Sequence, residues 1–358
     1  MVQSGKVRCV DNFSESQTND AVTLQNRVTV DGADTVAAMC AEKMRALKAE
    51  GKCTKLVGRS FDLTSAYRQL AVSDESSKWS RIAVFNPHTR KTECFRQFCL
   101  PFGARASVTA FIRAARMLQF LALQIGVVVS CYFDDFIVIS VPELSGPTEK
   151  AFAALLDLVG FAYDKEGPKA DAMSEEVSAL GVVFDLSGSQ AGVLRVRNTE
   201  RRIEEVTKKI ASTLSGRFLS PGEAATLKGR LGFAEGQLFG RAARKLINDL
   251  GSFVLASRQR SPITDELAQS LNAVSSLLQN GKAREIDTKS HEILHLYTDA
   301  SFCPEDGTGG IGGVLCSGAG VVLAWFGEDL DQEFCNKLKA EGQSQLIGEL
   351  EALAVLAA

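Results

Sequence analysis

Three acidic residues carry the strongest chemical signal in this sequence. Asp134 and Asp135 are adjacent, and they lie between two apolar runs, 127–132 and 136–141, that are typical of short buried strands. Two neighbouring carboxylates in such a place are costly to bury unless each is paired or bound to a cation. An ordinary hairpin turn, in which Asp is common, explains the pair at least as well when it is taken alone.

The third acid, Asp62, ends another apolar run, 56–63, which predicts a strand. A strand that delivers an acid at its C-terminal end can place that acid beside the tip of a neighbouring hairpin. Asp62 and Asp134 would then hold two divalent cations about 3.5–4 Å apart, which is the geometry of two-metal phosphoryl transfer. Oxygen-only ligands favour two Mg²⁺ ions, with Mn²⁺ as an alternative.

The elements around these acids change character along the chain. Up to about residue 187 the pattern is mixed, with strands at 79–85 and 92–99, helices at 107–125 and 147–158, and strands at 177–185 and 193–197. Beyond residue 198 it turns helical, with a capping box at 220–223, a helix start at Ser261-Pro262 and a helix end at Gly281. From residue 293 strands return, and a helix follows from about residue 344.

Two segments match known site motifs, but the secondary structure expected around them does not fit those sites. His291-Glu292-Ile293-Leu294-His295 fits the HExxH pattern of zinc hydrolases, but it runs into a strand-like alternation that would hold the two histidines about 13 Å apart. Residues 307–312 fit the GxGxxG pattern of dinucleotide sites, but they lead into a strand instead of opening a helix. We expect a glycine-rich hairpin turn there.

Composition limits the class of protein. The 358 residues carry a net charge of −3 and nine cysteines, an odd number, with no CxxC pair. These features, with no signal peptide and no uncharged apolar run of membrane-spanning length, favour reduced thiols and a cytoplasmic or nuclear location without membrane contact. The charge is segregated, because residues 195–260 hold fourteen Lys or Arg and six Asp or Glu. This basic stretch fits either a phosphate-binding surface or solvated helical faces.

Motifs around the three acids resemble those of a known enzyme family. Three segments resemble motifs A, B and C of reverse transcriptases in their order and spacing. They are FDLTSAYRQL (61–70), LPFGARASVTAF (100–111) and YFDDFIVIS (132–140). The closest resemblance is to retrotransposons of the long-terminal-repeat or tyrosine-recombinase (DIRS-like) type. Further similarity lies in KVRCVDNFSESQTN (6–19), GFAYDKEGPKA (160–170) and ALGVVFD (179–185), which resemble the fingers motif, motif D and motif E.

The resemblance implies an α+β right-hand polymerase and a domain division. Fingers and palm are expected over 1–187, a helical thumb and connection over 188–287, and a truncated ribonuclease H-like α/β domain over 288–358. In that last part LYTDASF, GGIGGVL and GELEALAVLAA resemble the start of a ribonuclease H domain. Asp299 and Glu349 match two of its four carboxylates, so we expect no nuclease activity from this partial site.

Roles follow from the motifs residue by residue. The resemblance implies Asp62 and Asp134 as catalytic metal ligands and Asp135 as a weaker third one. Tyr67 falls at the steric-gate position that excludes ribonucleotides. The alternative interpretation is that Tyr67 is an aromatic residue of the core. Phe102 and Gly103 match the loop beneath the incoming base. Lys6 and Arg8 are expected to contact the triphosphate, and the alternative is that they line a solvated strand edge. Lys165 or Lys169 is expected to donate a proton to pyrophosphate.

The sequence therefore predicts an RNA-directed DNA polymerase of a retroelement, which extends a primer on an RNA or DNA template with deoxynucleoside triphosphates. Two alternatives stay open. One is a catalytically inactive remnant that at most binds nucleic acid. The other is an RNA-templated RNA polymerase, which Tyr67 and the ribonuclease H-like segment disfavour.

Overall fold

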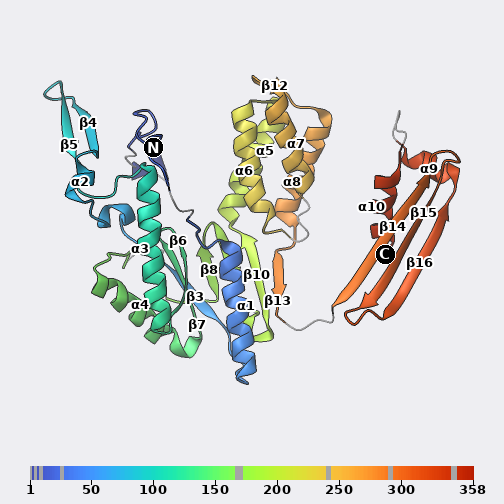
Figure 1. The fold of residues 1–358 in the computed structure, drawn as a ribbon, viewed down its shortest axis with the longest axis horizontal. Helices are drawn as coiled ribbons and strands as arrows, with labels where there is room; N and C mark the ends of the chain where they lie inside the picture. The colour runs from blue at the N-terminus through green and yellow to red at the C-terminus, as the bar shows by residue number, and fades with distance from the viewer. Residues whose placement is uncertain are drawn as a thin grey trace. The chain divides into compact units, whose positions relative to one another are not determined.

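The computed structural model describes residues 2–3, 6–7, 11–24, 28–165, 172–238, 243–288, 293–339 and 345–358. The chain divides into two compact units, Met1–Thr288 and Lys289–Ala358, and each is described by itself. Figure 1 shows the first unit as a sheet covered by helices, a second sheet and a group of helices, and the second unit as a separate sheet with helices on it.

The centre of the first unit is a three-stranded antiparallel sheet in the order β3-β7-β6, made of β3 (Val57–Asp62), β7 (Asp135–Ser140) and β6 (Val128–Tyr132). Strand β7 is apolar on both faces. Phe136 and Val138 belong to the core shared with α3 and α4, whereas Ile137 and Ile139 belong to the core shared with α1. The predicted strands 56–63, 127–132 and 136–141 are confirmed within one residue or two.

Helices cover both faces of this sheet, with α1 (Ala33–Ala49) on one side and α3 (Arg105–Gln124) and α4 (Ser145–Val159) on the other (Figure 1). The predicted end of α3 at Gly126 is confirmed, since this glycine has a φ of +81° that continues no helix. By length and hydropathy α3 resembles a membrane-crossing helix. In this structure its Phe111 and Leu118 are fully buried in the core around β6 and β7.

A second sheet adjoins the first. Its order is β13-β10-β9-β8, from β8 (Glu176–Ala179), β9 (Val182–Asp185), β10 (Val193–Asn198) and β13 (Arg284–Asp287). Gly58 of β3 exchanges two backbone hydrogen bonds with Ser174, just before β8. A β-carbon at Gly58 would lie 2.6 Å from a methyl group of Ile139 and 2.8 Å from the carbonyl oxygen of Val138. Only glycine fits where the two sheets meet.

Four helices, α5 (Glu200–Gly216), α6 (Pro221–Glu235), α7 (Arg244–Ala256) and α8 (Asp265–Asn280), enclose a core of their own. The predicted capping box is confirmed, because Ser220 and Glu223 cap α6 reciprocally. The helix start predicted at Ser261-Pro262 is wrong. These residues form β12, which pairs with β11 (Phe218–Leu219), and Thr264 caps α8 by accepting a hydrogen bond from the Leu267 amide.

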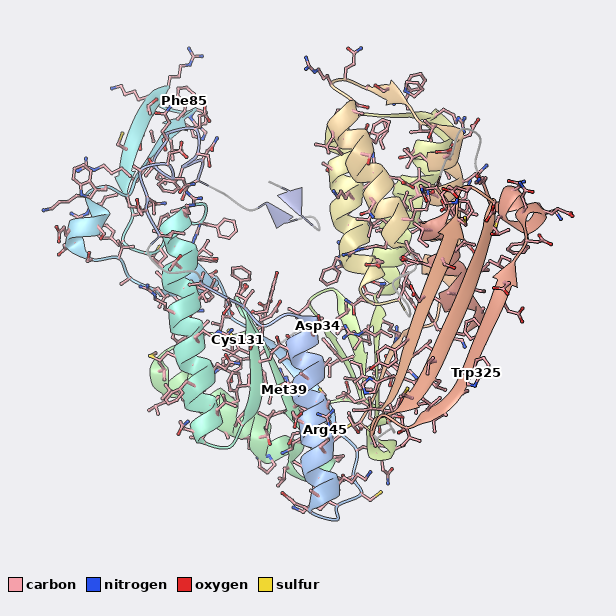
Figure 2. The ribbon with its side chains drawn as sticks, turned by 45° about the vertical axis from the view of Figure 1, so that its right-hand side comes forward. Asp34, Met39, Arg45, Phe85, Cys131 and Trp325 are labelled. Carbon is pink, nitrogen blue, oxygen red and sulfur yellow. The ribbon has the colours of Figure 1, made fainter. Side chains whose placement is uncertain are left out.

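The remaining elements of the first unit are short. They are β1 (Val2–Gln3), β2 (Lys6–Val7), the 3-10 helices η1 (Ala66–Gln69), η2 (Pro142–Leu144) and η3 (Ser189–Ala191), helix α2 (Asp74–Ser77), and the hairpin of β4 (Arg81–Asn86) and β5 (Lys91–Arg96). This hairpin was predicted from the sequence. Figure 2 shows Phe85 near its outer end, where the side chain is 60% exposed.

The second unit is an antiparallel sheet in the order β14-β15-β16, with β14 (Leu294–Cys303), β15 (Thr308–Ser317) and β16 (Val322–Leu330), the strand that carries Trp325 (Figure 2). Helices α9 (Gln332–Leu338) and α10 (Ile347–Ala357) pack on one face. Gly307 has a φ of +66° at the β14–β15 turn, so the expected glycine-rich hairpin is confirmed. In the rejected HExxH segment, His291 and Glu292 lie outside the described residues, and His295 lies in β14.

The four-helix core yields a stability prediction. Leu231 on α6 is fully buried, whereas Leu255 on α7 is 89% exposed. We expect Leu231→Ala to lower the free energy of unfolding of α5–α8 by about 2–5 kcal/mol, because it leaves a cavity. The matched variant Leu255→Ala should change it by less than about 0.5 kcal/mol. Hydrogen exchange of peptides from α5–α8 measures both, and equal protection in the two variants would contradict this core.

Candidate active site

The sheet register brings the three predicted carboxylates to one end of one sheet. Asp62 of β3 lies directly opposite Asp135 of β7, and Asp135 in turn lies opposite Tyr132 of β6. Asp134 occupies the turn between β6 and β7, where its carbonyl oxygen accepts a 3.2 Å hydrogen bond from the Leu63 amide. All three acids are partly exposed. The apolar strands behind them therefore fix carboxylates that solvent and ligands can reach.

The turn that carries Asp134 has an unusual backbone. Phe133 has a φ of +51°, a left-handed conformation that is uncommon for a bulky residue. Its ring packs edge-on against Tyr132 with the centroids 5.0 Å apart, and its carbonyl oxygen accepts a 3.6 Å hydrogen bond from the Cys131 thiol. Such strained residues persist only where neighbouring contacts hold them, and they are frequent at functional sites.

The donor chemistry of this site suits a hard divalent cation. Aspartate oxygens are the ligands that Mg²⁺ accepts, and Mg²⁺ commonly takes one or two carboxylates and completes its shell with water and substrate phosphate. Throughout the part of the chain that the structure describes, no three His, Cys, Asp or Glu residues gather closely enough to enclose a metal ion by themselves. The donor chemistry of Asp62, Asp134 and Asp135 is therefore compatible with a divalent cation whose shell is completed by water or phosphate, and their roles as ligands stay predictions.

The other motif residues line a hollow of about 530 Å³. Tyr67, Phe102 and Gly103 all border it. The Tyr67 ring stacks on Phe111 at 4.8 Å and meets Phe102 edge-on at 5.6 Å. Burial, and next the negative charge of Asp134, raise the pKa of the Tyr67 phenol above its ordinary value. The structure thus brings Tyr67, from the segment after β3, and Phe102 and Gly103, from the loop before α3, to one hollow.

One residue of this hollow was missed by the sequence reasoning. The Asn19 side chain donates a 3.1 Å hydrogen bond to the carbonyl oxygen of Gly103 and accepts a 2.8 Å bond from the amide of Arg105, the first residue of α3. The residue before the helix, Ala104, has no side chain that could cap it. Asn19 therefore caps α3 and holds the Phe102-Gly103 loop, in which Gly103 has a φ of +118°.

A second missed residue, Gln69, ties the segment after β3 to the segment after α4. Its side-chain amide donates to the carbonyl oxygen of Ala162 at 2.8 Å and accepts from the Ala162 amide at 2.7 Å. The same two segments are joined by hydrogen bonds from the Thr64 amide to Ala162 and from the Asp164 amide to the carbonyl oxygen of Asp62. The backbone of Asp62 is thereby held on both sides.

The residues predicted to contact the triphosphate or to protonate pyrophosphate are placed only in part. Lys165 forms an exposed ion pair with Asp157 at 3.1 Å, and this hydrogen bond and charge raise the lysine pKa above its ordinary value. Lys6 lies in the short strand β2, of which only the backbone is described. Arg8 and Lys169 lie outside the described residues. Their roles stay predictions.

A second hollow, of about 570 Å³, borders the other side of the turn. Tyr132, Asp135 and Ser60 line it from the central sheet, and Thr199, Arg201 and Phe233 line it from the start of α5 and from α6. The basic stretch of the sequence thus supplies a positively charged residue close to Asp135.

The two predicted ribonuclease H residues lie in the second unit. Asp299 is exposed on β14 and borders an open hollow of about 330 Å³ together with Ser301, Glu328 and Asp329. Glu349 lies in the first turn of α10. The assignment of Asp299 and Glu349 as a partial ribonuclease H site stays a prediction.

The fold resembles that of a retroviral reverse transcriptase. The chain is similar to the foamy viral protease-reverse transcriptase in complex with double-stranded DNA, with 19% identity, a TM-score of 0.52, and coverage of 95% of this chain and 62% of that one. It is also similar to the form of that protein called dRH, again with double-stranded DNA, at 17% identity and a TM-score of 0.55.

These likenesses concern the fold. In the comparison with the dRH form, 91% of this chain covers 49% of the solved chain. This chain therefore spans about half to three fifths of the length of the two solved chains that it matches. No protein-family model and no curated protein sequence matches it. The predicted α+β fold is confirmed as a mixed helix and strand fold that resembles a retroviral reverse transcriptase, whereas the retrotransposon type and the subdomain names stay predictions.

The cap on α3 can be tested directly. We expect Asn19→Ala to lower the free energy of unfolding by about 0.5–2 kcal/mol, the usual effect of losing a helix cap. Amide exchange at Arg105 should accelerate, because Asn19 accepts the hydrogen bond of that amide. The exposed residue Gln279 on α8 offers a control, Gln279→Ala, that should change neither quantity. Unchanged exchange at Arg105 in Asn19→Ala would show that the cap does not form.

Proposed function

We propose that this protein is an RNA-directed DNA polymerase of a retroelement, which adds deoxynucleotides to a primer 3′-OH on an RNA or DNA template. The observation that carries the proposal is the register that sets Asp62 opposite Asp135, with Asp134 in the adjoining turn. Support also comes from the solved structures of similar fold, which are reverse transcriptases in complex with double-stranded DNA.

In the proposed reaction, Asp62 and Asp134 hold the divalent cations and Asp135 contributes a weaker ligand. Two Mg²⁺ ions, or Mn²⁺, would lower the pKa of the primer hydroxyl and neutralise charge on the leaving pyrophosphate. The carboxylates need to move little, because β3 and β7 hold their backbones in register. That preorganisation is the main contribution the chain makes to the chemical step.

The incoming nucleotide is proposed to occupy the hollow between Tyr67 and the Phe102-Gly103 loop. The Tyr67 ring, held by its stack on Phe111, would lie under the sugar and exclude a 2′-hydroxyl group. Lys6 and Arg8 would contact the triphosphate, and Lys165 or Lys169 would protonate pyrophosphate. The basic residues of α5 and α6, with Arg201 beside the turn, would contact the phosphates of the primer–template.

Primer extension tests the assignment of the carboxylates. We expect Asp134→Ala and Asp62→Asn each to lower extension by at least about 100-fold, because each removes a metal ligand that stabilises the transition state. Removing Mg²⁺ with a chelator should abolish extension by the unaltered protein. Glu204→Gln, an exposed carboxylate on α5, is the control and should extend normally.

A folded, unaltered protein that binds primer–template and extends nothing would identify the inactive remnant. Extension that survives Asp134→Ala would refute the catalytic assignment.

The choice of sugar tests Tyr67. We expect Tyr67→Ala to raise incorporation of ribonucleotides relative to deoxynucleotides by about 10-fold or more, an effect of roughly 1.4 kcal/mol or more on the difference between the two barriers. Tyr67→Phe keeps the ring and should keep the discrimination. Equal use of both sugars by the unaltered protein would favour an RNA polymerase, and loss of discrimination in Tyr67→Phe would assign the effect to the hydroxyl.

A further inference from the structure

A cluster of polar side chains binds the edge of the central sheet just before the carboxylate turn. Strand β6 is an edge strand, so none of the strands that the structure describes pairs with the backbone groups on its outer side. The Asp31 amide donates to the carbonyl oxygen of Cys131 at 3.1 Å, and the Asp31 carboxylate accepts from the Cys131 amide at 3.0 Å. Both backbone groups of Cys131 are therefore held by one residue.

The Asp31 carboxylate is itself fixed. Its side chain is only 9% exposed, and one oxygen pairs with the Arg116 guanidinium of α3 at 2.9 Å. The other oxygen accepts a 2.8 Å hydrogen bond from Gln119, whose side-chain amide also donates to the carbonyl oxygen of Val129 on β6. Arg116 donates in addition to Gln119 and to the carbonyl oxygen of Thr29. The side chains of Asp31, Arg116 and Gln119 thus all have partners, which gives the cluster one defined geometry.

Cys131 links this cluster to the turn. Its thiol is buried in the core that the sheet shares with α3 and α4, and it donates to the carbonyl oxygen of Phe133. Burial raises the pKa of the thiol to about 12, so it stays protonated and keeps its hydrogen for that bond. Phe133 is the residue with the strained backbone, and Asp134 follows it.

We propose that Asp31 is a positioning residue for the carboxylate turn. Its carboxylate, oriented by Arg116 and Gln119, fixes the end of β6, and Cys131 transmits that position to Phe133 and Asp134. The inference rests on the proposed function in one respect only, namely that the positioned turn carries the catalytic carboxylates. The hydrogen bonds by which Asp31 fixes Cys131 do not depend on the proposed function and are measured separately.

The first test measures thiol accessibility. We expect Asp31→Asn, which removes the charge paired with Arg116, to accelerate alkylation of Cys131 by about 10-fold, because the edge of β6 opens more often. Cys40 on α1 is equally buried and should react at its original rate. Gln119→Ala keeps every charge and serves as a second, milder variant. The control Glu42→Gln removes an exposed carboxylate that is paired with Arg45 on α1 and should alter neither thiol.

Acceleration of Cys131 alone supports the proposal. An equal acceleration of Cys131 and Cys40 would indicate general destabilisation and would overturn it, as would unchanged reactivity of Cys131 in both Asp31→Asn and Gln119→Ala.

The second test measures primer extension. We expect Asp31→Asn to lower kcat by about 10- to 100-fold, since a small displacement of catalytic groups has effects of that size. The KM for deoxynucleotide and the affinity for primer–template should stay unchanged. Leu231→Ala, destabilised in the separate α5–α8 core, should keep its kcat at a temperature where it is folded. An unchanged kcat in Asp31→Asn would overturn the positioning role. If the unaltered protein extends no primer, the proposed function is refuted. The alkylation result then decides whether Asp31 fixes Cys131.

Discussion

The burial of strand β7 on both faces is the constraint from which the rest of the first unit follows. Because Phe136 and Val138 point to one side and Ile137 and Ile139 to the other, helices must cover both faces of the sheet. The strand then has no room for a charge along its length, so its acid lies at the end. The antiparallel partner β3 ends at the same place and brings Asp62 with it.

Gathering acids at one end of a sheet creates repulsion that the fold has to resist. Hydrogen bonds from polar side chains to the neighbouring backbone help to hold the acids in place. Gln69 holds the segment after Asp62, Asn19 holds the loop across the hollow, and Asp31 holds the strand before Asp134. The carboxylates stay partly exposed, while the backbone segments that carry them are held in position.

Sequence reasoning succeeds here where the signal is local and fails where it is distant. The strands around Asp62 and Asp134 follow from short apolar runs, and the Ser220 cap follows from a four-residue pattern. Asn19 and Asp31 were not predicted, because each meets partners more than 80 positions away through side-chain contacts that have no sequence period. At residues 261–264 two helix starts compete, and Thr264 prevails because Ile263 is buried and Ser261-Pro262 pairs with β11.

The route of the chain through the second sheet has a mechanical consequence. Helix α5 begins two residues after β10 ends, and α8 ends shortly before β13, which pairs with β10 at Val196 and Arg284. The four helices are therefore an insertion between two neighbouring strands and are tethered at both ends. Asn198 of β10 also donates a 2.9 Å hydrogen bond to the carbonyl oxygen of Ala234 in α6, and the Arg284 amide of β13 donates to the carbonyl oxygen of Gln237 at 3.1 Å. The helical group is therefore anchored to the sheet at its middle as well as at its two ends, so a shift of β10 or β13 is passed directly to the helices.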